Sequence, residues 1–158
     1  MTAKSILVVD YDVSARQVLR DFFESEGFKV FQATDGEDAL KMTSKKRFDV
    51  VLTELKMPGL GGLDVLREIR RSHTETVVVI FTEYPSAETA QKAWEMGCDA
   101  YITKPMNLEQ LEQVISRNLA QRRWAHIAGQ KGFGKRLGQM KVQIESPKIV
   151  PQKRPQKK

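Results

Sequence analysis

Five short apolar runs, separated by amphipathic stretches, constrain the fold of this chain more than any other feature. The runs are residues 6–10, 29–32, 49–54, 77–82 and 100–103, and each ends at polar or turn-forming residues. Continuous apolar runs of this length are typical of strands that are buried on both faces. Their alternation with helices is typical of a parallel sheet with helices on both sides. We therefore predict an α/β fold with a doubly wound, five-stranded parallel sheet.

The stretches between the runs have the apolar spacing of helices. Leu19 and Phe23 belong to the apolar stripe of the first stretch, which ends at Gly27. Such a stripe indicates a helix with one face on the core. Residues that commonly cap helix N-termini come just before the first, second and fourth stretches: Asp12 or Ser14, Asp35, and Ser86.

Length and composition favour one domain with an appendage. The 158 residues exceed a usual domain of about 100–150 residues only slightly. No apolar run approaches the roughly 20 residues of a membrane span, and the N-terminal run is too short for a signal peptide. Cys98 is the single cysteine, so an internal disulfide is excluded, and we expect a half-buried structural thiol. The pattern indicates a soluble cytoplasmic protein without a membrane span.

Charge divides the chain into a body and a tail. Residues 122–158 hold eleven Lys or Arg and one acid, Glu145, whereas residues 1–121 hold 15 basic and 19 acidic residues. Glycines and prolines recur in the tail, which we expect to be largely disordered. Such a tail can bind nucleic acid or another polyanion, or be a solvated end. Residues 140–144 alternate apolar and polar side chains and could form a short strand only against a partner.

Polar residues follow the predicted strands where they end. In open parallel sheets, ligands bind beyond the carboxyl ends of the strands. The residues at these ends are Asp10, Tyr11, Glu54, Thr82, Glu83 and Lys104. Several carboxylates would therefore face one lysine and one hydroxyl. Taken singly, a strand-end Asp, Thr or Lys is more commonly a helix cap or a solvated loop charge.

Five motifs occur in order along the body: ILVVD at 6–10, TDGEDAL at 34–40, KMPGLGG at 56–62, FTEY at 81–84 and YITKP at 101–105. By these motifs, residues 4–121 resemble the receiver domain of bacterial two-component response regulators. The resemblance implies a flavodoxin-like strand order, 2-1-3-4-5. It also implies a switch in which an aspartate after the third strand accepts a phosphoryl group from a histidine kinase, with the help of Mg²⁺.

The positions that the resemblance assigns to Mg²⁺ are altered here. They are Asp10, Tyr11, Glu54 and the backbone carbonyl of Lys56. Mg²⁺ requires oxygen ligands in a near-octahedral shell, and a neutral phenol with a pKa of about 10 is a poor ligand. Asp12 is the next acid along the chain, but its position should direct it elsewhere. We expect Mg²⁺ binding to be weak or absent, and no other cofactor.

Glu54 stands where the resemblance places the phosphoacceptor aspartate. Its extra methylene moves the carboxylate about 1.5 Å further into the pocket. There it can imitate part of a phosphoryl group toward Lys104 and Thr82. Glu83 replaces a residue that is usually small, and its charge opposes an anionic phosphodonor. We interpret the chain as a pseudo-receiver.

Other switch residues are retained. Thr82 and Tyr101 match the hydroxyl and aromatic switch pair of the family, and Lys104 matches the lysine that contacts the phosphoryl group. A satisfied strand-end hydroxyl and a half-buried aromatic would explain Thr82 and Tyr101 equally well. We predict a stand-alone signalling module that is not an enzyme, acts independently of phosphorylation, and binds a histidine kinase or an output protein. The alternatives are a receiver that still accepts phosphate, and a carrier for a polyanion-binding tail.

Overall fold

The computed structural model describes residues 2–130, with side chains through Ala125. The strands are β1 (Ser5–Val9), β2 (Lys29–Ala33), β3 (Val50–Thr53), β4 (Val77–Thr82) and β5 (Ala100–Thr103). The helices are α1 (Val13–Ser25), α2 (Gly36–Lys45), α3 (Gly62–Ser72), α4 (Ala87–Glu95) and α5 (Leu108–Gln130). Strands and helices alternate along the chain, as the apolar runs predict.

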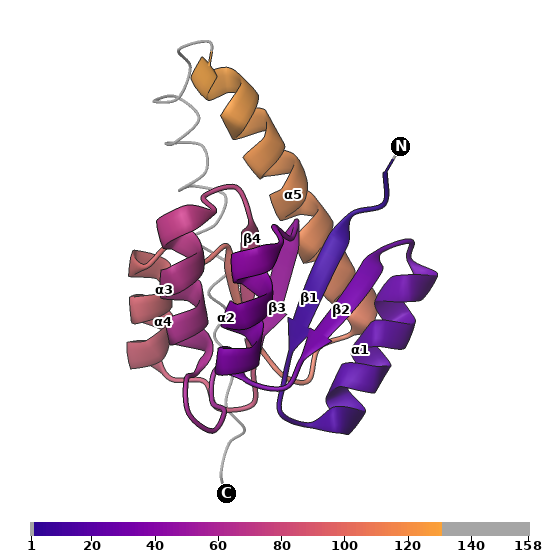
Figure 1. The fold of residues 1–158 in the computed structure, drawn as a ribbon, viewed down its shortest axis with the longest axis vertical. Helices are drawn as coiled ribbons and strands as arrows, with labels where there is room; N and C mark the ends of the chain where they lie inside the picture. The colour runs from indigo at the N-terminus through magenta and orange to yellow at the C-terminus, as the bar shows by residue number, and fades with distance from the viewer. Residues whose placement is uncertain (1, 131–158) are drawn as a thin grey trace, which may run out of the picture.

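The five strands form one parallel sheet in the order β2-β1-β3-β4-β5 (Figure 1). The predicted doubly wound, flavodoxin-like sheet is therefore confirmed. Val9 pairs with both Ala33 and Thr53, so β1, β2 and β3 end at the same edge. Thr82 pairs with Thr103 at the end of β4 and β5. The sheet thus gathers the residues after each strand along one rim.

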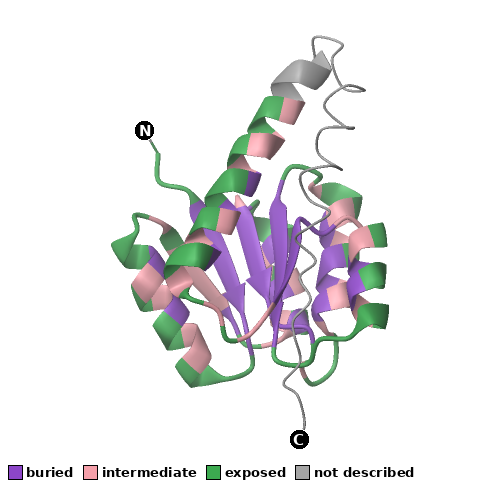
Figure 2. Cartoon of the chain, turned by 180° about the vertical axis from the view of Figure 1, so that it is seen from behind, coloured by how far each residue is buried: buried purple, intermediate pink, exposed green. Residues whose placement is uncertain are grey.

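Two apolar layers enclose the sheet (Figure 2), whose strands β1, β3, β4 and β5 are buried on both faces, whereas the edge strand β2 is mostly half-buried. Alternate residues of β1 show the division. Leu7 and Val9 face the layer formed with α2, α3 and α4. Ile6 and Val8 face the layer formed with α1 and α5. Burial on both faces explains why the strands read as continuous apolar runs.

Side chains cap three of the helices as predicted. Asp12 rather than Ser14 caps α1, because its carboxylate accepts the N–H of Ser14. Asp35 caps α2 and Ser86 caps α4 in the same way. After α1 the chain turns at Gly27, whose φ of 93° favours glycine.

The last helix extends past the boundary at Gln121. Figure 1 shows α5 running beyond the sheet, and it ends at Gln130. Residues 122–130 are thus helical, although they were assigned to the tail. Arg122 accounts for part of this extension, since it binds Asp99 on the body through two nitrogens, each 2.9 Å from Oδ1. The remaining tail, 131–158, lies outside the described residues, and so do its predicted disorder and the possible strand at 140–144.

Two further findings bear on the sequence-based expectations. Cys98 is buried, with 4% of its surface exposed, so the expectation of a half-buried thiol is wrong. It packs in the layer shared with α3 and α4. Within the part of the chain that the structure describes, no helix is long and apolar enough to span a membrane.

Candidate functional site

The carboxyl rim of the sheet brings four of the predicted residues together. Asp10 follows β1, Glu54 follows β3, Thr82 ends β4, and Lys104 follows β5. We call these four residues the acidic pocket. Asp10, Glu54 and Thr82 are 5%, 6% and 0% exposed, although each is polar. Buried polar groups of this kind are stable only with hydrogen-bond partners or opposite charges.

Lys104 supplies the opposite charge to both carboxylates. Its Nζ lies 2.7 Å from Oδ2 of Asp10 and 3.0 Å from Oε1 of Glu54. Burial alone lowers the pKa of Lys104, but hydrogen bonds to Asp10 and Glu54 and their negative charges outweigh it. The pKa of Lys104 is therefore raised above its ordinary value. The ammonium remains charged at neutral pH and bridges β1, β3 and β5.

The second oxygen of Glu54 is also fully engaged. Its Oε2 accepts a hydrogen bond from the hydroxyl of Thr82 at 2.5 Å. It accepts two further bonds from the backbone N–H groups of Leu55, at 2.7 Å, and Lys56, at 3.3 Å. A lysine, a hydroxyl and two amides therefore surround one carboxylate. This is the donor set expected around a larger oxyanion.

Tyr101 is buried and connects β5 to the start of α4. Its side chain is in the apolar layer, and the residue is 4% exposed. Its hydroxyl lies 2.6 Å from Oγ1 of Thr89 and accepts the N–H of Ser86 at 3.2 Å. The hydroxyl of Thr82 accepts the N–H of Tyr84 at 2.9 Å in the same loop. Both predicted switch residues thus hold the β4–α4 connection.

Tyr11 and Asp12 do not join the acidic pocket. Tyr11 is 63% exposed. The carboxylate of Asp12 caps α1, and its backbone N–H donates to Oδ1 of Asp10 at 3.0 Å. Arg16, which the sequence reasoning missed, donates to the backbone carbonyl of Asp10 at 2.7 Å. A basic residue one turn into the helix after a strand-end aspartate is the only signal that could have suggested it.

The acidic pocket does not fit Mg²⁺ as it stands. Lys104 already engages both Asp10 and Glu54, and Tyr11 offers no carboxylate. Among the side chains that the structure describes, no three His, Cys, Asp or Glu groups converge as a metal site. The backbone N–H of Lys56 donates a hydrogen bond to Glu54. A cation in this pocket would compete with the ammonium of Lys104 for the same two carboxylates.

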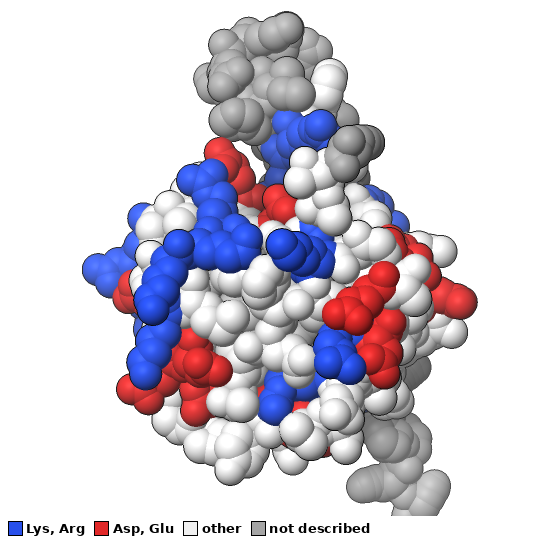
Figure 3. Space-filling view, turned by 45° about the vertical axis from the view of Figure 1, so that its right-hand side comes forward, with Lys and Arg blue, Asp and Glu red and all other residues white. Residues whose placement is uncertain are grey.

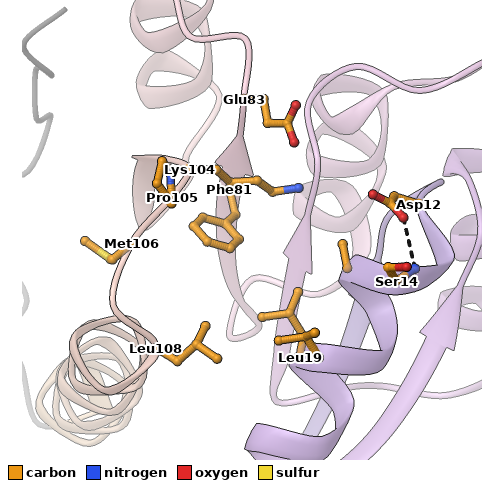
Figure 4. A pocket seen from close by; sticks show the side chains of 11 residues that line it. Asp12, Ser14, Leu19, Phe81, Glu83, Lys104, Pro105, Met106 and Leu108 are labelled. Atoms are coloured by element: carbon orange, nitrogen blue, oxygen red, sulfur yellow. Dashed lines mark hydrogen bonds between the residues drawn. The ribbon is translucent and has the colours of Figure 1, made fainter. Parts of the chain in front are cut away.

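Beside the acidic pocket lies an open groove of about 710 Å³. Asp12 and Glu83 stand at one end of it (Figure 4). Its walls are apolar and come from α1, β4 and the β5–α5 loop, including Val18, Phe81 and Met106. We call this the α1 groove. The sequence analysis placed Glu83 among the residues at the strand ends but did not foresee the groove.

The sequence and the fold agree with one family of proteins. Residues 6–116 match the response regulator receiver domain. The chain belongs to this family. Among solved structures, it is similar to a receiver domain protein of Methanospirillum hungatei, with a TM-score of 0.75 and 27% identity. That match covers 77% of this chain and 98% of the other. It is also similar to chemotaxis protein CheY4 of Vibrio cholerae, with a TM-score of 0.71 and 29% identity. That match covers 75% of this chain and 100% of CheY4.

Curated relatives of this receiver differ in length. Sporulation initiation phosphotransferase F of Bacillus subtilis is 30% identical over 119 residues, covering 75% of this chain and 96% of that protein. Regulatory protein AtoC of Escherichia coli is 36% identical over 120 residues, covering 75% of this chain but 26% of that protein. The receiver thus spans nearly all of one relative and about a quarter of the other.

Proposed function

We propose that this chain is a pseudo-receiver, a signalling module that acts by binding another protein and not by accepting a phosphoryl group. Its partner is a histidine kinase or an output protein of the bacterial cytoplasm. On this proposal the chain catalyses no reaction and requires no metal. A stand-alone role is part of the proposal, supported by the match over nearly the whole of one relative.

The observation that carries the proposal is the environment of Glu54. Its two oxygens receive the ammonium of Lys104, the hydroxyl of Thr82 and two backbone N–H groups. By the family resemblance, Lys104 and Thr82 are the groups that contact the phosphoryl group. Glu54 therefore already satisfies the contacts that phosphorylation would otherwise create. A built-in carboxylate of this kind favours the switched conformation without chemistry.

The contacts of Thr82 and Tyr101 support a route from the pocket to the surface. Thr82 binds Glu54 on one side and Tyr84 on the other. Tyr101 holds the N-terminus of α4 through Ser86 and Thr89. On our proposal, the partner binds the surface formed by α4, β5 and α5, whose position these contacts fix.

The rival function is a receiver that still cycles through an acyl phosphate, on Glu54 or a nearby acid. Asp10 is retained and buried in the pocket, which favours this alternative. A relative that the receiver matches almost throughout is named a phosphotransferase. The rival requires Mg²⁺ at Asp10 and Asp12, and thus a rearrangement of the ion pair with Lys104 and of the cap on α1.

Acetyl phosphate separates the two functions. We expect no change in the intact mass of the full chain after incubation with acetyl phosphate and Mg²⁺. A stoichiometric gain of one phosphoryl group that hydroxylamine removes would overturn the pseudo-receiver. The matched control combines Glu54→Asp, Tyr11→Asp and Glu83→Ala, and we expect this triple variant to become phosphorylated. Full phosphorylation of Glu54→Asp alone would show that Tyr11 and Glu83 do not impede the chemistry.

A further inference from the structure

The α1 groove is an apolar surface left open on the described part of the receiver. Val18 is 56% exposed at its edge, and Leu19 and Phe81 form its floor at 4% and 6% exposed. Met106 and Leu108 form the opposite wall (Figure 4). An exposed apolar surface bordered by charged residues is typical of a binding groove.

Two carboxylates at the mouth of the groove give it a negative end. Asp12 caps α1 and Glu83 is exposed, and within residues 2–125 no ion pair is formed by either side chain. Lys104 also borders the groove, but its ammonium is bound by Asp10 and Glu54. It therefore does not neutralise Asp12 and Glu83. The groove is suited to an apolar segment that carries basic residues.

The chain itself contains such a segment. Residues 140–154 hold five aliphatic side chains (Met140, Val142, Ile144, Ile149, Val150), together with four basic residues and one acid. Chain length decides which part of the tail can reach the groove. Leu108 lies on the groove wall, and α5 rises about 1.5 Å per residue, so Gln130 lies about 33 Å away along the helix. An extended chain spans at most about 3.6 Å per residue, so residue 140 is about the first to reach the groove.

We propose that the α1 groove is the docking site of the chain's own segment 140–154. The aliphatic side chains of the segment cover Val18, Phe81 and Met106, and its lysines and arginine face Asp12 and Glu83. Residues 131–139 serve as the connection back along α5. Docking removes apolar surface from water and pairs opposite charges, while the chain connection keeps the local concentration of the segment high.

The test uses the full chain with Cys98→Ala and Ser146→Cys, ¹⁵N-labelled and carrying a nitroxide at residue 146. We expect paramagnetic broadening at the amides around Val18, Met106 and Leu108, which lose at least half their intensity relative to the reduced label. The amides of α3 should keep theirs. Added salt should weaken the broadening, because ions screen the pairing with Asp12 and Glu83. Uniform broadening, or broadening centred on another surface, would overturn the proposal.

Two matched variants test the groove itself. Val18→Glu and Trp124→Glu introduce the same charge at apolar side chains with similar exposure, 56% and 58%, but only Val18 lines the groove. We expect Val18→Glu to abolish the selective broadening and Trp124→Glu to leave it unchanged. Persistence in Val18→Glu, or an equal loss in both variants, would contradict the proposal.

A mixed sample identifies which molecule supplies the segment. Spin-labelled chain without ¹⁵N is mixed with ¹⁵N-labelled chain without the nitroxide, and we expect no broadening. Broadening in this sample would assign the groove to the tail of a second copy and overturn docking within one chain. None of these readouts depends on Glu54, so the docking site and the pseudo-receiver function can fail separately.

Discussion

At the scale of single residues, Glu54 determines how charges and hydrogen bonds are paired in the acidic pocket. Without its carboxylate, Lys104 would pair with Asp10 alone, and the hydroxyl of Thr82 and the amide of Leu55 would lose an acceptor. The sequence suggested the contacts with Lys104 and Thr82, because these residues also lie at the carboxyl ends of strands. It could not show the two amide bonds, which depend on how the chain turns after β3. The bonding of Glu54 is thus partly predictable from spacing and partly a product of loop geometry.

Replacing Glu54 by glutamine tests its charge at nearly constant shape. The amide keeps one acceptor oxygen, but it loses the ion pair with Lys104 and places an N–H₂ group near other donors. We expect Glu54→Gln to lower the free energy of unfolding by about 1–3 kcal/mol and to weaken partner binding. Urea titration measures the first effect. Partner binding is measured by comparing how much partner the native chain and Glu54→Gln capture under the same conditions. Equal capture would contradict the active-state role of Glu54.

Lys104→Met leaves Asp10 and Glu54 facing each other without a cation. Removing one member of a buried ion pair costs about 3–5 kcal/mol. We therefore expect Lys104→Met to lower the free energy of unfolding at pH 7 by about this amount. In the native chain the pKa of Lys104 is raised, so its stabilising contribution is fully present below the ordinary lysine value of 10.5 and is lost as the pH rises through the raised pKa.

Urea titrations of both chains at pH 7 and above pH 10.5 check this prediction, and the difference between the chains should shrink at the higher pH. Exposed Lys92, which lies 3.7 Å from Glu88 on α4, gives the control variant Lys92→Met. Its surface pair should contribute about 1 kcal/mol or less. A cost for Lys104→Met no larger than that of Lys92→Met would show that the ammonium of Lys104 does not stabilise the two carboxylates as the structure indicates.

At the scale of secondary structure elements, the apolar runs located the strands closely. β4 and β5 have the predicted bounds, because each is buried on both faces and bounded by polar residues. The runs at 6–10 and 49–54 each end one residue too late, because Asp10 and Glu54 follow their strands and enter the acidic pocket. The length of α5 could not be predicted in the same way. Its extension is fixed partly by Arg122 and Asp99, which are far apart in sequence.

Asp99 binds two helices at the amino ends of the strands, opposite the acidic pocket at their carboxyl ends. Its side chain is 1% exposed and lies 2.8 Å from Arg70 of α3 and 2.9 Å from Arg122 of α5. Arg122 also donates to the backbone carbonyl of Thr74. Burial lowers the pKa of Arg70, and Asp99 opposes the shift, so the guanidinium remains charged. This cluster joins α3, β5 and α5.

Asp99→Asn should therefore destabilise the receiver and release α5. The amide cannot balance two buried guanidinium groups, so we expect a loss of about 3–5 kcal/mol in the free energy of unfolding. Arg122→Ala should cost less, because Arg70 still pairs with Asp99. Hydrogen exchange should show faster exchange in α5 beyond Arg117 for both variants. Protection equal to that of the native chain would show that the extension does not depend on this cluster.

At the scale of the whole molecule, charge is unevenly distributed. Residues 131–158 hold nine Lys or Arg and one acid, whereas residues 1–130 hold 17 basic and 19 acidic residues. Lys and Arg side chains nevertheless gather on one face of the described structure (Figure 3). Exposed basic residues cluster around the end of α2, where Lys46 lies 5.0 Å from the ring centre of Phe31 and 5.2 Å from that of Phe48. The body thus has its own basic surface, which the net charge conceals.

The tail, and not this basic surface, should supply most of the affinity for polyanions. The positive charge of the tail is hardly offset within residues 131–158, whereas acidic side chains lie beside some of the basic ones on the body (Figure 3). Each phosphate neutralised in duplex DNA contributes about −0.9 to the slope of log affinity against log salt, so four contacts give about −3.6. We expect binding to be independent of base sequence, because repeated glycines and prolines disfavour the rigid helix that would read base edges.

Fluorescence anisotropy with labelled duplex and single-stranded oligonucleotides at several salt concentrations measures this binding. The comparison is between the full chain and a chain ending at Gln130, because α5 continues to that residue. Equal binding by both would assign the polyanion site to the basic surface near α2, and Lys46→Glu should then weaken it. No binding by either would remove polyanions as ligands of the tail. If only the full chain binds, the oligonucleotide should also abolish the broadening that the nitroxide at residue 146 causes at Val18. The basic residues of segment 140–154 cannot pair with a phosphate backbone and with Asp12 and Glu83 of the α1 groove at the same time.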